Sequence, residues 1–541
     1  MDISKKVVIF VLLENLKINK HMMNEFQQTL NRVNNFQQTE NGATGYSTSG
    51  QNLVDLNFVV PSRHKNVSPV ELEKFVQALN EDTVLAVKWL FYLRDVREGL
   101  GERDSFIKLF KTLWLADPVS AGKVVKLIPE YGRWKDVIDI LAEFPNDNDL
   151  TETIYLLIEN QLREDCVNLT EDKSVSLLAK WLPSVNASGK SRKLAKRICN
   201  KLGLTFENYR KVLSSLRKYL DVTEVKTCGG KWNEIDYNKV SSNANARYLN
   251  SFMRHDPERR QKYLDVLSAP VASGVVMHAS NLYPHEVYAK YSEAHRRYYG
   301  VEVNEDQGIE ALWANLKNID TVGNTMVVVD GSGSMVTNIK GSKIMAIDVA
   351  RSLGVFFSER CIGEFKDKVI EFSARPHYID LTDCKSLADK YNTLSRYNDC
   401  SNTNLEKVFD LLLKTALDHN LPQSELPQRI LVVSDMEFDY ATNICSGVHN
   451  EVMARYQTLF ESIKTKWIKY GYTMPNIVFW NINSRTNTIP VTANECGVTL
   501  VSGYSVNNVK MVLSGDVNPW TALKSVLESD RYNAIDTALA E

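Results

Sequence analysis

The spacing of apolar positions along the chain changes near residue 320. From about residue 70 to 315, apolar residues recur every three or four positions, as in the stretches 70–96 and 206–222. Short breaks in this pattern fall at Gly, Pro and Asn. A period of 3.6 residues is typical of amphipathic helices. The pattern therefore predicts a long all-helical region with few strands.

After residue 320, short apolar runs alternate with helical patterns. The runs lie at 325–330, 368–373, 429–435, 476–482 and 497–503, and helical stretches of 10 to 20 residues separate most of them. Short buried strands joined by helices are typical of right-handed βαβ units. We expect a parallel sheet that is covered by helices on both faces.

The chain of 541 residues is too long for one hydrophobic core. We predict a multidomain α + α/β protein with three segments. Residues 1–62 form an extended lead-in, because residues 30–62 are rich in Asn, Gln, Ser, Thr and Gly. Residues 63–319 form a helical domain, and residues 320–541 form an α/β domain.

Composition excludes several classes of protein. The formal net charge is −2, so the whole chain has no general attraction to nucleic acid or to an anionic membrane. Eight cysteines occur without a CxxC pair, which favours reduced thiols and a cytoplasmic protein. The apolar run at 7–13 ends at Glu14 without a cleavage site, and no run approaches the length of a membrane span. We therefore expect neither a secretory signal nor a membrane partner.

Oxygen-bearing side chains follow two of the predicted strands. In a sheet of this kind, ligands bind in the crevice beyond the carboxyl ends of the strands. Aspartate and two serines, spaced by glycines, follow the first strand; a threonine precedes a helix, and a second aspartate ends another strand. Hard, mostly neutral oxygens suit Mg²⁺ or Mn²⁺ and leave a coordination position for an acidic group of a protein partner. The candidate ligands are Asp330, Ser332, Ser334, Thr403 and Asp435.

The alternative for these residues is a capping loop, because Ser, Gly and Asp after a strand also cap helices. Three pieces in order on predicted strand ends favour the metal site. The chain contains no P-loop, and residues 330–335 do not follow the G-x-S-x-G pattern of a nucleophile elbow. No general base or nucleophile pair is evident, so we do not expect an enzyme.

The three pieces resemble the metal-ion-dependent adhesion site of von Willebrand factor A domains. A helical-repeat region followed by such a domain is similar to the Ro autoantigen (TROVE) family of RNA-binding proteins. The motifs "YGRWKDV" (131–137), "LYPHEV" (282–287), "VSDMEFD" (433–439) and "GYTMPNIVFWNIN" (471–483) are similar to a branch from plants, fungi, large DNA viruses and phages that is known only as a domain of unknown function. This resemblance covers residues 39 to about 515.

The Ro resemblance implies a solenoid or ring of HEAT-like helix pairs whose basic surface holds RNA, followed by a Rossmann-like von Willebrand factor A domain. The stretch 187–218 carries ten basic residues against one acid, Glu207. On the predicted helices these residues form columns that could follow a phosphate backbone. The candidate RNA-binding residues are Lys193, Arg197, Lys201, Arg210, Lys211, Arg217 and Lys218. The alternative is an ordinary solvated helix face.

A second charged stretch, 91–106, carries three arginines and several acids around a two-glycine turn. We expect its charges to form intramolecular ion pairs between adjacent helices.

Two functions are compatible with these observations. The first is a non-catalytic, Ro-like ribonucleoprotein component that binds RNA, but not DNA, and uses a divalent cation to bind a protein partner. The alternative is a structural or scaffold protein without an RNA role, such as a virion or assembly component if the source is viral.

Overall fold

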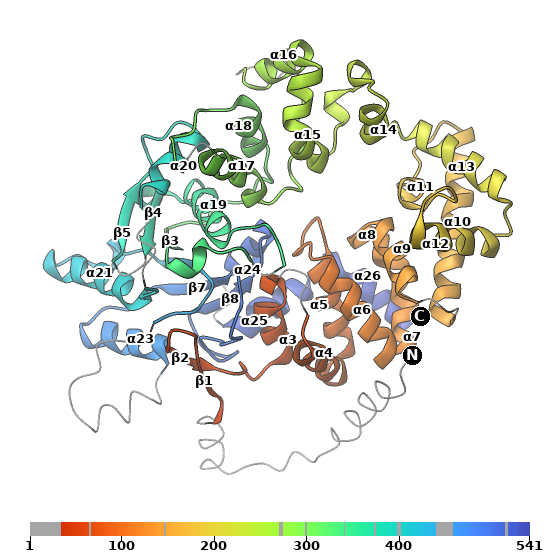
Figure 1. Cartoon of the computed structure of the whole chain (residues 1–541). Helices are drawn as coiled ribbons and strands as arrows, with labels where there is room; N and C mark the ends of the chain where they lie inside the picture. Colours follow the sequence, from red (N-terminus) through yellow and green to blue (C-terminus); the bar gives the residue numbers. More distant parts are fainter. Residues whose placement is uncertain are drawn as a thin grey trace.

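The computed structural model describes residues 34–63, 67–144, 146, 148–269, 274–297, 300–339, 341–372, 375–397, 402–439, 458–513 and 518–541. A two-stranded hairpin comes first, a succession of helices follows, and a six-stranded sheet with its own helices completes the chain (Figure 1). The strands are β1 (Phe36–Gln38), β2 (Thr44–Tyr46), β3 (Thr325–Asp330), β4 (Lys368–Phe372), β5 (His377–Asp380), β6 (Arg429–Ser434), β7 (Asn476–Asn481) and β8 (Val498–Ser502).

Helices α3 to α18 precede the large sheet, and α19 to α26 accompany or follow it. The first group is α3 (Asn52–Val59), α4 (Pro69–Glu81), α5 (Thr83–Arg94), α6 (Asp104–Ala116), α7 (Pro118–Val124), α8 (Ile128–Tyr131), α9 (Trp134–Glu143), α10 (Asp149–Thr170), α11 (Leu178–Trp181), α12 (Gly189–Lys201), α13 (Phe206–Tyr219), α14 (Thr223–Cys228), α15 (Ser242–His255), α16 (Pro257–Leu267), α17 (Pro284–Arg297) and α18 (Gln307–Ala314). The second group is α19 (Ala346–Ser358), α20 (Leu387–Ser395), α21 (Leu405–Asp418), α23 (Leu459–Lys469), α24 (Val509–Leu513), α25 (Pro519–Leu527) and α26 (Asn533–Ala540).

Local sequence explains where the helices begin. Ser68 and Glu71 form a capping box at the start of α4, and the Asp82 carboxylate accepts a hydrogen bond of 2.9 Å from Leu85 N at the start of α5. The apolar stripes of these helices are buried against one another, including Phe75 and Trp89. The predicted helical region is confirmed.

The six strands of the large sheet lie in the order β5-β4-β3-β6-β7-β8. All neighbouring pairs are parallel except β4 and β5, which run antiparallel at one edge. The strand order therefore reverses between β3 and β6, as in doubly wound Rossmann-like sheets. Strands β3 and β6 are buried almost throughout because helices cover both faces. The predicted multidomain α + α/β fold class is confirmed.

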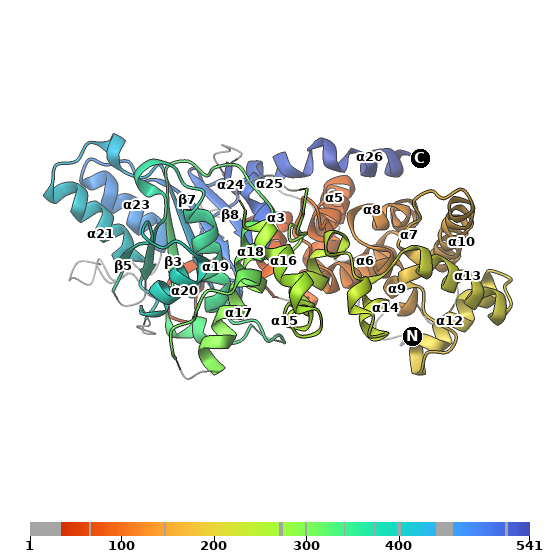
Figure 2. The same cartoon turned by 90° about the horizontal axis from the view of Figure 1, so that it is seen from above.

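The helical region contacts the sheet domain at both of its ends. Near its start, α3 packs against β8, and α5 packs against α25 and α26. At its far end, α17 packs against α19 and α20. The helices thus follow a curved path that leaves the sheet domain on one side and returns to it on the other (Figures 1 and 2).

In the predicted extended lead-in, residues 1–62, the part from residue 36 onward is packed against the rest of the protein rather than forming an unpacked segment. Strands β1 and β2 form an antiparallel hairpin, and α3 is buried along most of its length. Tyr46 of the hairpin pairs with Ile489 of the sheet domain. The polar composition of the segment gave no indication of this packing. The residues against which the hairpin packs lie more than 400 positions away in the sequence. Residues 1–33, with the apolar run at 7–13, lie outside the described residues.

The charged stretch 91–106 forms intramolecular ion pairs, as predicted. Arg94 pairs with Asp136 at 2.6 Å, and both side chains are fully buried. Arg97 pairs with Glu130 at 2.8 Å. These pairs tie α5 and the turn after it to α8 and α9.

Six cysteines of the described residues are free thiols: Cys166, Cys199, Cys228, Cys361, Cys384 and Cys496. Cys400 and Cys445 lie outside the described residues. Within the described ranges, no helix has the length and apolar character needed to cross a bilayer.

The end of the chain is held to the helical region by Asp95. This fully buried carboxylate accepts hydrogen bonds from Arg531 Nε at 2.8 Å and Arg531 Nη2 at 3.1 Å. Asp95→Asn should weaken this pairing and cost about 3 kcal/mol, because it replaces two charge-assisted hydrogen bonds from Arg531, which then keeps only Glu130 as an acidic partner. We expect amides of residues 519–541 to exchange with deuterium roughly a hundredfold faster.

The matched control is Lys126→Ala, which removes an exposed ion pair with Glu541 near the same end of the chain. An exposed pair contributes about 1 kcal/mol or less. Equal exchange rates in Asp95→Asn and wild type would contradict the role given to Asp95.

Candidate metal centre

The candidate ligands lie where the strand order of the sheet reverses. Asp330 is the last residue of β3, and Asp435 directly follows β6, the neighbouring strand. The carboxyl ends of parallel neighbours meet at one edge of a sheet, and the reversal opens a crevice there. The fold therefore brings two carboxylates from distant parts of the sequence to one place.

Hydrogen bonds fix the loop that follows β3, residues 331–336, which we call the first loop, around Asp330. Ser332 N donates to Asp330 Oδ1 at 2.9 Å, and the Ser434 hydroxyl donates to Asp330 Oδ2. The hydroxyl oxygens of Ser332 and Ser334 lie 3.1 Å apart, and the Ser334 hydroxyl acts to lower the pKa of the neighbouring Asp435 carboxylate. Four of the five predicted ligands thus form one connected oxygen cluster.

Thr403 lies next to the turn that follows β6. Its side chain is buried just before α21, and its carbonyl oxygen accepts a hydrogen bond of 2.8 Å from Asp439 N. This bond places Thr403 beside the 435–439 turn that carries Asp435. Its hydroxyl oxygen lies 3.4 Å from Asn41 Nδ2 of the N-terminal hairpin.

The two carboxylates are buried and repel each other. Burial, together with the negative charge of Asp435, raises the pKa of Asp330 to about 7. Burial also raises the pKa of Asp435. The positive charge of the Arg485 guanidinium group lowers this pKa and partly offsets the effect of burial. Two buried carboxylates this close are unfavourable unless a cation or a proton offsets their charge.

The residues fit a hard divalent cation. Asp435 Oδ2 is buried and makes no hydrogen bond with any described residue, so it has a lone pair to offer a cation. In the described ranges, no cluster of three His, Cys, Asp or Glu side chains could hold a metal ion. A centre here would therefore depend on hydroxyl oxygens as well as carboxylates, a set that suits Mg²⁺ or Mn²⁺.

Several residues of this site are not evident from the sequence. Arg485 Nη2 lies 3.1 Å from Asp435 Oδ2, and its other nitrogen pairs with Glu40 of the hairpin at 2.7 Å. The Glu437 carboxylate accepts hydrogen bonds from Thr486 N and from Glu40 N. Ser434 could have been found, because it directly precedes Asp435. No sequence motif marks Arg485 or Glu40 as part of the site, because only the folded chain brings these two residues together.

A buried ion pair between Arg351 and Glu371 packs against the first loop at Gly331. Arg351 of α19 donates to both oxygens of Glu371 at 3.0 and 2.8 Å, and also to Tyr397 O at 2.8 Å. Gly331 packs directly on Glu371, so that a Cβ atom at position 331 would lie 2.7 Å from Glu371 Oε1. Glycine at 331 is thus required by close packing.

The basic residues of α12 and α13 fall into two groups. Arg197 donates to Phe144 O at 2.7 Å and contacts Tyr155, and Arg217 donates to Ala179 O at 2.8 Å and Leu182 O at 2.6 Å. Both guanidinium groups bind carbonyl oxygens at the C-terminal ends of neighbouring helices, a favourable place for a cation. The side chains of these two members of the predicted columns are therefore only half-exposed, and Arg217 also lines the groove described below.

The other five candidates lie on the surface of α12 and α13. Lys201 pairs with Glu152, and Lys211 pairs with Glu207 at 2.8 Å. The side chains of Lys193, Arg210 and Lys218 are exposed. Arg210 and Lys218 line a groove of about 730 Å³ between α13 and α14, to which Lys226 and Lys231 also contribute. Local positive charge is therefore present, although less of it is available than the sequence predicted.

Fold and site together define a protein with an all-helical region and a Rossmann-like domain whose crevice carries two buried carboxylates and three hydroxyls. Residues 324–533 match the family described as a domain of unknown function, DUF7788, and residues 150–324 match a second such family, DUF2828. An uncharacterized protein of Acanthamoeba polyphaga mimivirus is 29% identical over 538 residues, which are 93% of this chain and 89% of that protein. The boundary between the two family matches falls directly before β3.

Among solved structures, the crystal structure of the Deinococcus radiodurans Ro (RSR) protein aligns with 90% of this chain and 100% of its own. The sequence identity is 12% and the TM-score is 0.44. A likeness this weak carries no inference about function.

Close packing at Gly331 can be tested by adding one methyl group. Gly331→Ala should lower the free energy of unfolding by about 2 kcal/mol, because Glu371 is fixed by Arg351 and cannot move aside. Gly122→Ala is the control, since a Cβ atom there meets nothing within 4 Å. Thermal unfolding measures both, and a Gly331→Ala protein as stable as wild type would show that the loop does not depend on this contact.

Proposed function

We propose that this protein is a non-catalytic RNA-binding protein, a Ro-like ribonucleoprotein component, with a metal-dependent crevice for a protein partner. The observation that carries the metal-crevice part of this proposal is the cluster of two buried carboxylates and two serine hydroxyls where the strand order reverses, with Thr403 beside the neighbouring turn. The exposed basic residues beside the groove of α13 and α14 support the RNA half.

The crevice has the chemistry of an adhesion site. Asp330, Ser332, Ser334, Thr403 and Asp435 would hold Mg²⁺ or Mn²⁺, and the cation would offer its remaining position to an acidic group of a partner. The residues of this chain supply two negative charges, so a bound divalent cation would be neutralised and a further carboxylate would not be strongly repelled.

The RNA half depends on charge. Exposed lysines and arginines on α12 and α13 would contact phosphates and give an affinity that falls with salt. The groove is lined by apolar side chains such as Val222 and Val225 as well as by basic ones. Two acids of the groove, Asp221 and Glu234, pair with Lys226 and Lys231, so Arg210 and Lys218 supply its available positive charge. Apolar and basic groups together suit an unpaired nucleotide, which presents a base as well as a phosphate.

The second candidate is a structural or scaffold protein without an RNA role. The contacts of Arg197 and Arg217 favour the scaffold candidate, because both guanidinium groups already donate hydrogen bonds to carbonyl oxygens of the protein itself. The resemblance to a mimivirus protein is compatible with this candidate too.

The metal proposal predicts a clear effect of one substitution. Asp330→Ala should reduce Mn²⁺ binding below detection, because it removes one of two carboxylates that would face the cation, and the sheet should stay folded. Electron paramagnetic resonance of free Mn²⁺ measures the binding, and circular dichroism checks the fold. Asp383→Ala is the control, since Asp383 is an exposed acid of the same domain. Equal Mn²⁺ binding by Asp330→Ala and wild type would contradict the site.

The RNA proposal predicts an effect of three charge reversals together, Lys193→Glu, Arg210→Glu and Lys218→Glu. Binding to single-stranded RNA should weaken for all sequences alike, and the slope of log affinity against log salt should flatten by about 0.7 for each lost phosphate contact. Fluorescence anisotropy at several salt concentrations measures both quantities.

The control for this experiment carries the same charge change elsewhere: Lys385→Glu, Lys414→Glu and Lys469→Glu, three exposed lysines of the sheet domain. Undetectable RNA binding by the wild-type protein at low salt would replace the RNA proposal with the scaffold candidate. Equal losses in the two triple variants would indicate attraction without a defined surface.

A further inference from the structure

Arg485 occupies the position of a counter-ion beside the candidate metal centre. Its Nη2 atom lies 3.1 Å from Asp435 Oδ2. The side chain of Asp435 is 0% exposed. The same carboxylate oxygen makes no hydrogen bond with any described residue. The contact is therefore an ion pair without directional hydrogen bonding, and it involves the oxygen that a divalent cation would need.

Glu40 holds Arg485 from the other side. It lies in the turn between β1 and β2, and its Oε2 atom is 2.7 Å from Arg485 Nη1. Asp435, Arg485 and Glu40 thus form a row of alternating charges that runs from the buried site to the surface. The side chain of Arg485 is 35% exposed and that of Glu40 is 56% exposed, so only the Asp435 end of this row is shielded from water.

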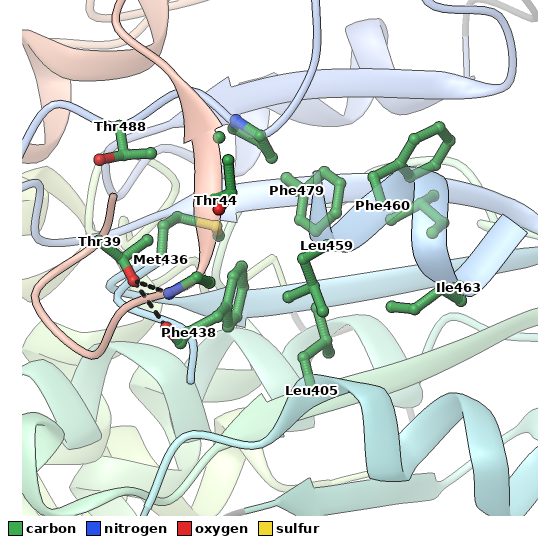
Figure 3. A pocket seen from close by; sticks show the side chains of 14 residues that line it. Thr39, Thr44, Leu405, Met436, Phe438, Leu459, Phe460, Ile463, Phe479 and Thr488 are labelled. Carbon is green, nitrogen blue, oxygen red and sulfur yellow. Dashed lines mark hydrogen bonds between the residues drawn. The ribbon is translucent and has the colours of Figure 1, made fainter. Parts of the chain in front are cut away.

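The hairpin turn that carries Glu40 is fixed to the loop after β6. Thr39 Oγ1 donates to Phe438 O at 2.7 Å, as Figure 3 shows, and Glu40 N donates to Glu437 Oε2 at 2.7 Å. Asn41 Nδ2 donates to Glu437 O at 2.7 Å. The turn lies over an apolar pocket where Phe438 and Phe479 face Leu459 and Phe460 (Figure 3). The position of Glu40 is therefore set by contacts other than its ion pair.

A buried carboxylate needs a positive charge nearby, because its transfer from water is costly. In the protein without a metal ion, the nearest described cation at Asp435 is Arg485. A divalent cation at the same oxygen would be repelled by the guanidinium group. The two cations therefore compete for Asp435, and the exposed part of the Arg485 side chain gives it room to withdraw toward Glu40.

We propose that Arg485 is the internal counter-ion of the metal-free site, that it competes with the divalent cation for Asp435, and that Glu40 of the N-terminal hairpin weakens this competition by neutralising Arg485. Arg485 is in this sense a residue that sets metal affinity without being a ligand. The inference rests on the proposed metal site and concerns how tightly that site binds.

The test compares Mn²⁺ binding by three single variants and by the double variant Glu40→Gln with Arg485→Gln. Arg485→Gln should bind Mn²⁺ about tenfold more tightly than wild type, because the competing charge is gone. Arg485→Lys keeps the charge and should bind close to wild type. Glu40→Gln should bind about threefold more weakly, because Arg485 then keeps its full charge. In the double variant, loss of Glu40 should have no further effect, since Glu40 acts only through Arg485.

A second measurement does not depend on the affinity alone. In EDTA, Arg485→Gln should melt at a lower temperature than wild type, because Asp435 is then uncompensated, and Mn²⁺ should reverse this loss. Arg396→Gln is the control: it breaks an exposed pair with Glu302, in which both side chains are 65% exposed, and should change neither quantity.

The outcomes separate this inference from the proposed metal site. If wild type and Arg485→Gln bind Mn²⁺ with equal affinity, the counter-ion role is overturned and the metal site stands. If neither protein binds Mn²⁺, the metal site itself is wrong and the inference is overturned with it. If Arg485→Gln binds and wild type does not, the competition is complete and the inference is supported.

Discussion

Two carboxylates buried side by side at the ends of β3 and β6 are the constraint on which the site depends. The sheet places Asp330 and Asp435 in neighbouring strands, and burial denies both of them water. The surroundings offset this charge with hydroxyl donors, with a backbone amide and with one guanidinium group. A hard divalent cation would offset it more completely than any of these, which is why the arrangement favours a metal centre.

The surrounding fold keeps this cluster in place. Arg351 and Glu371 form a buried pair against Gly331, and Arg351 also donates a hydrogen bond to Tyr397 O. Helix α17 of the helical region packs against α19, the helix that follows the first loop. This contact joins the helical region directly to the helix that follows the loop after β3.

The sequence was sufficient for features that depend on local pattern. The strand ends at Asp330 and Asp435 follow from apolar runs, and the alternation of serine and glycine after Asp330 marks the loop. Periodicity also placed Arg197 and Arg217 on their helices, but it could not show what lies opposite. The C-terminal carbonyl groups of α9 and α11 meet these arginines only in the folded chain.

The N-terminal hairpin shows the same limit more clearly. Its residues are polar and form short strands, so composition favoured an irregular segment. Its stability comes from pairing with residue 489 and from hydrogen bonds to residues 437 and 438. Glu40 and Arg485 are 445 positions apart in the sequence, and neither has a neighbour that marks it. Contacts of this range are set by topology, which local pattern does not contain.

The most direct measurement is anomalous X-ray diffraction from crystals of the protein grown with Mn²⁺. The account predicts one anomalous peak between the carboxylates of Asp330 and Asp435, within coordination distance of the serine hydroxyls, with Arg485 displaced from Asp435 toward Glu40. A map without a peak among those oxygens, from crystals saturated with Mn²⁺, would contradict the central claim.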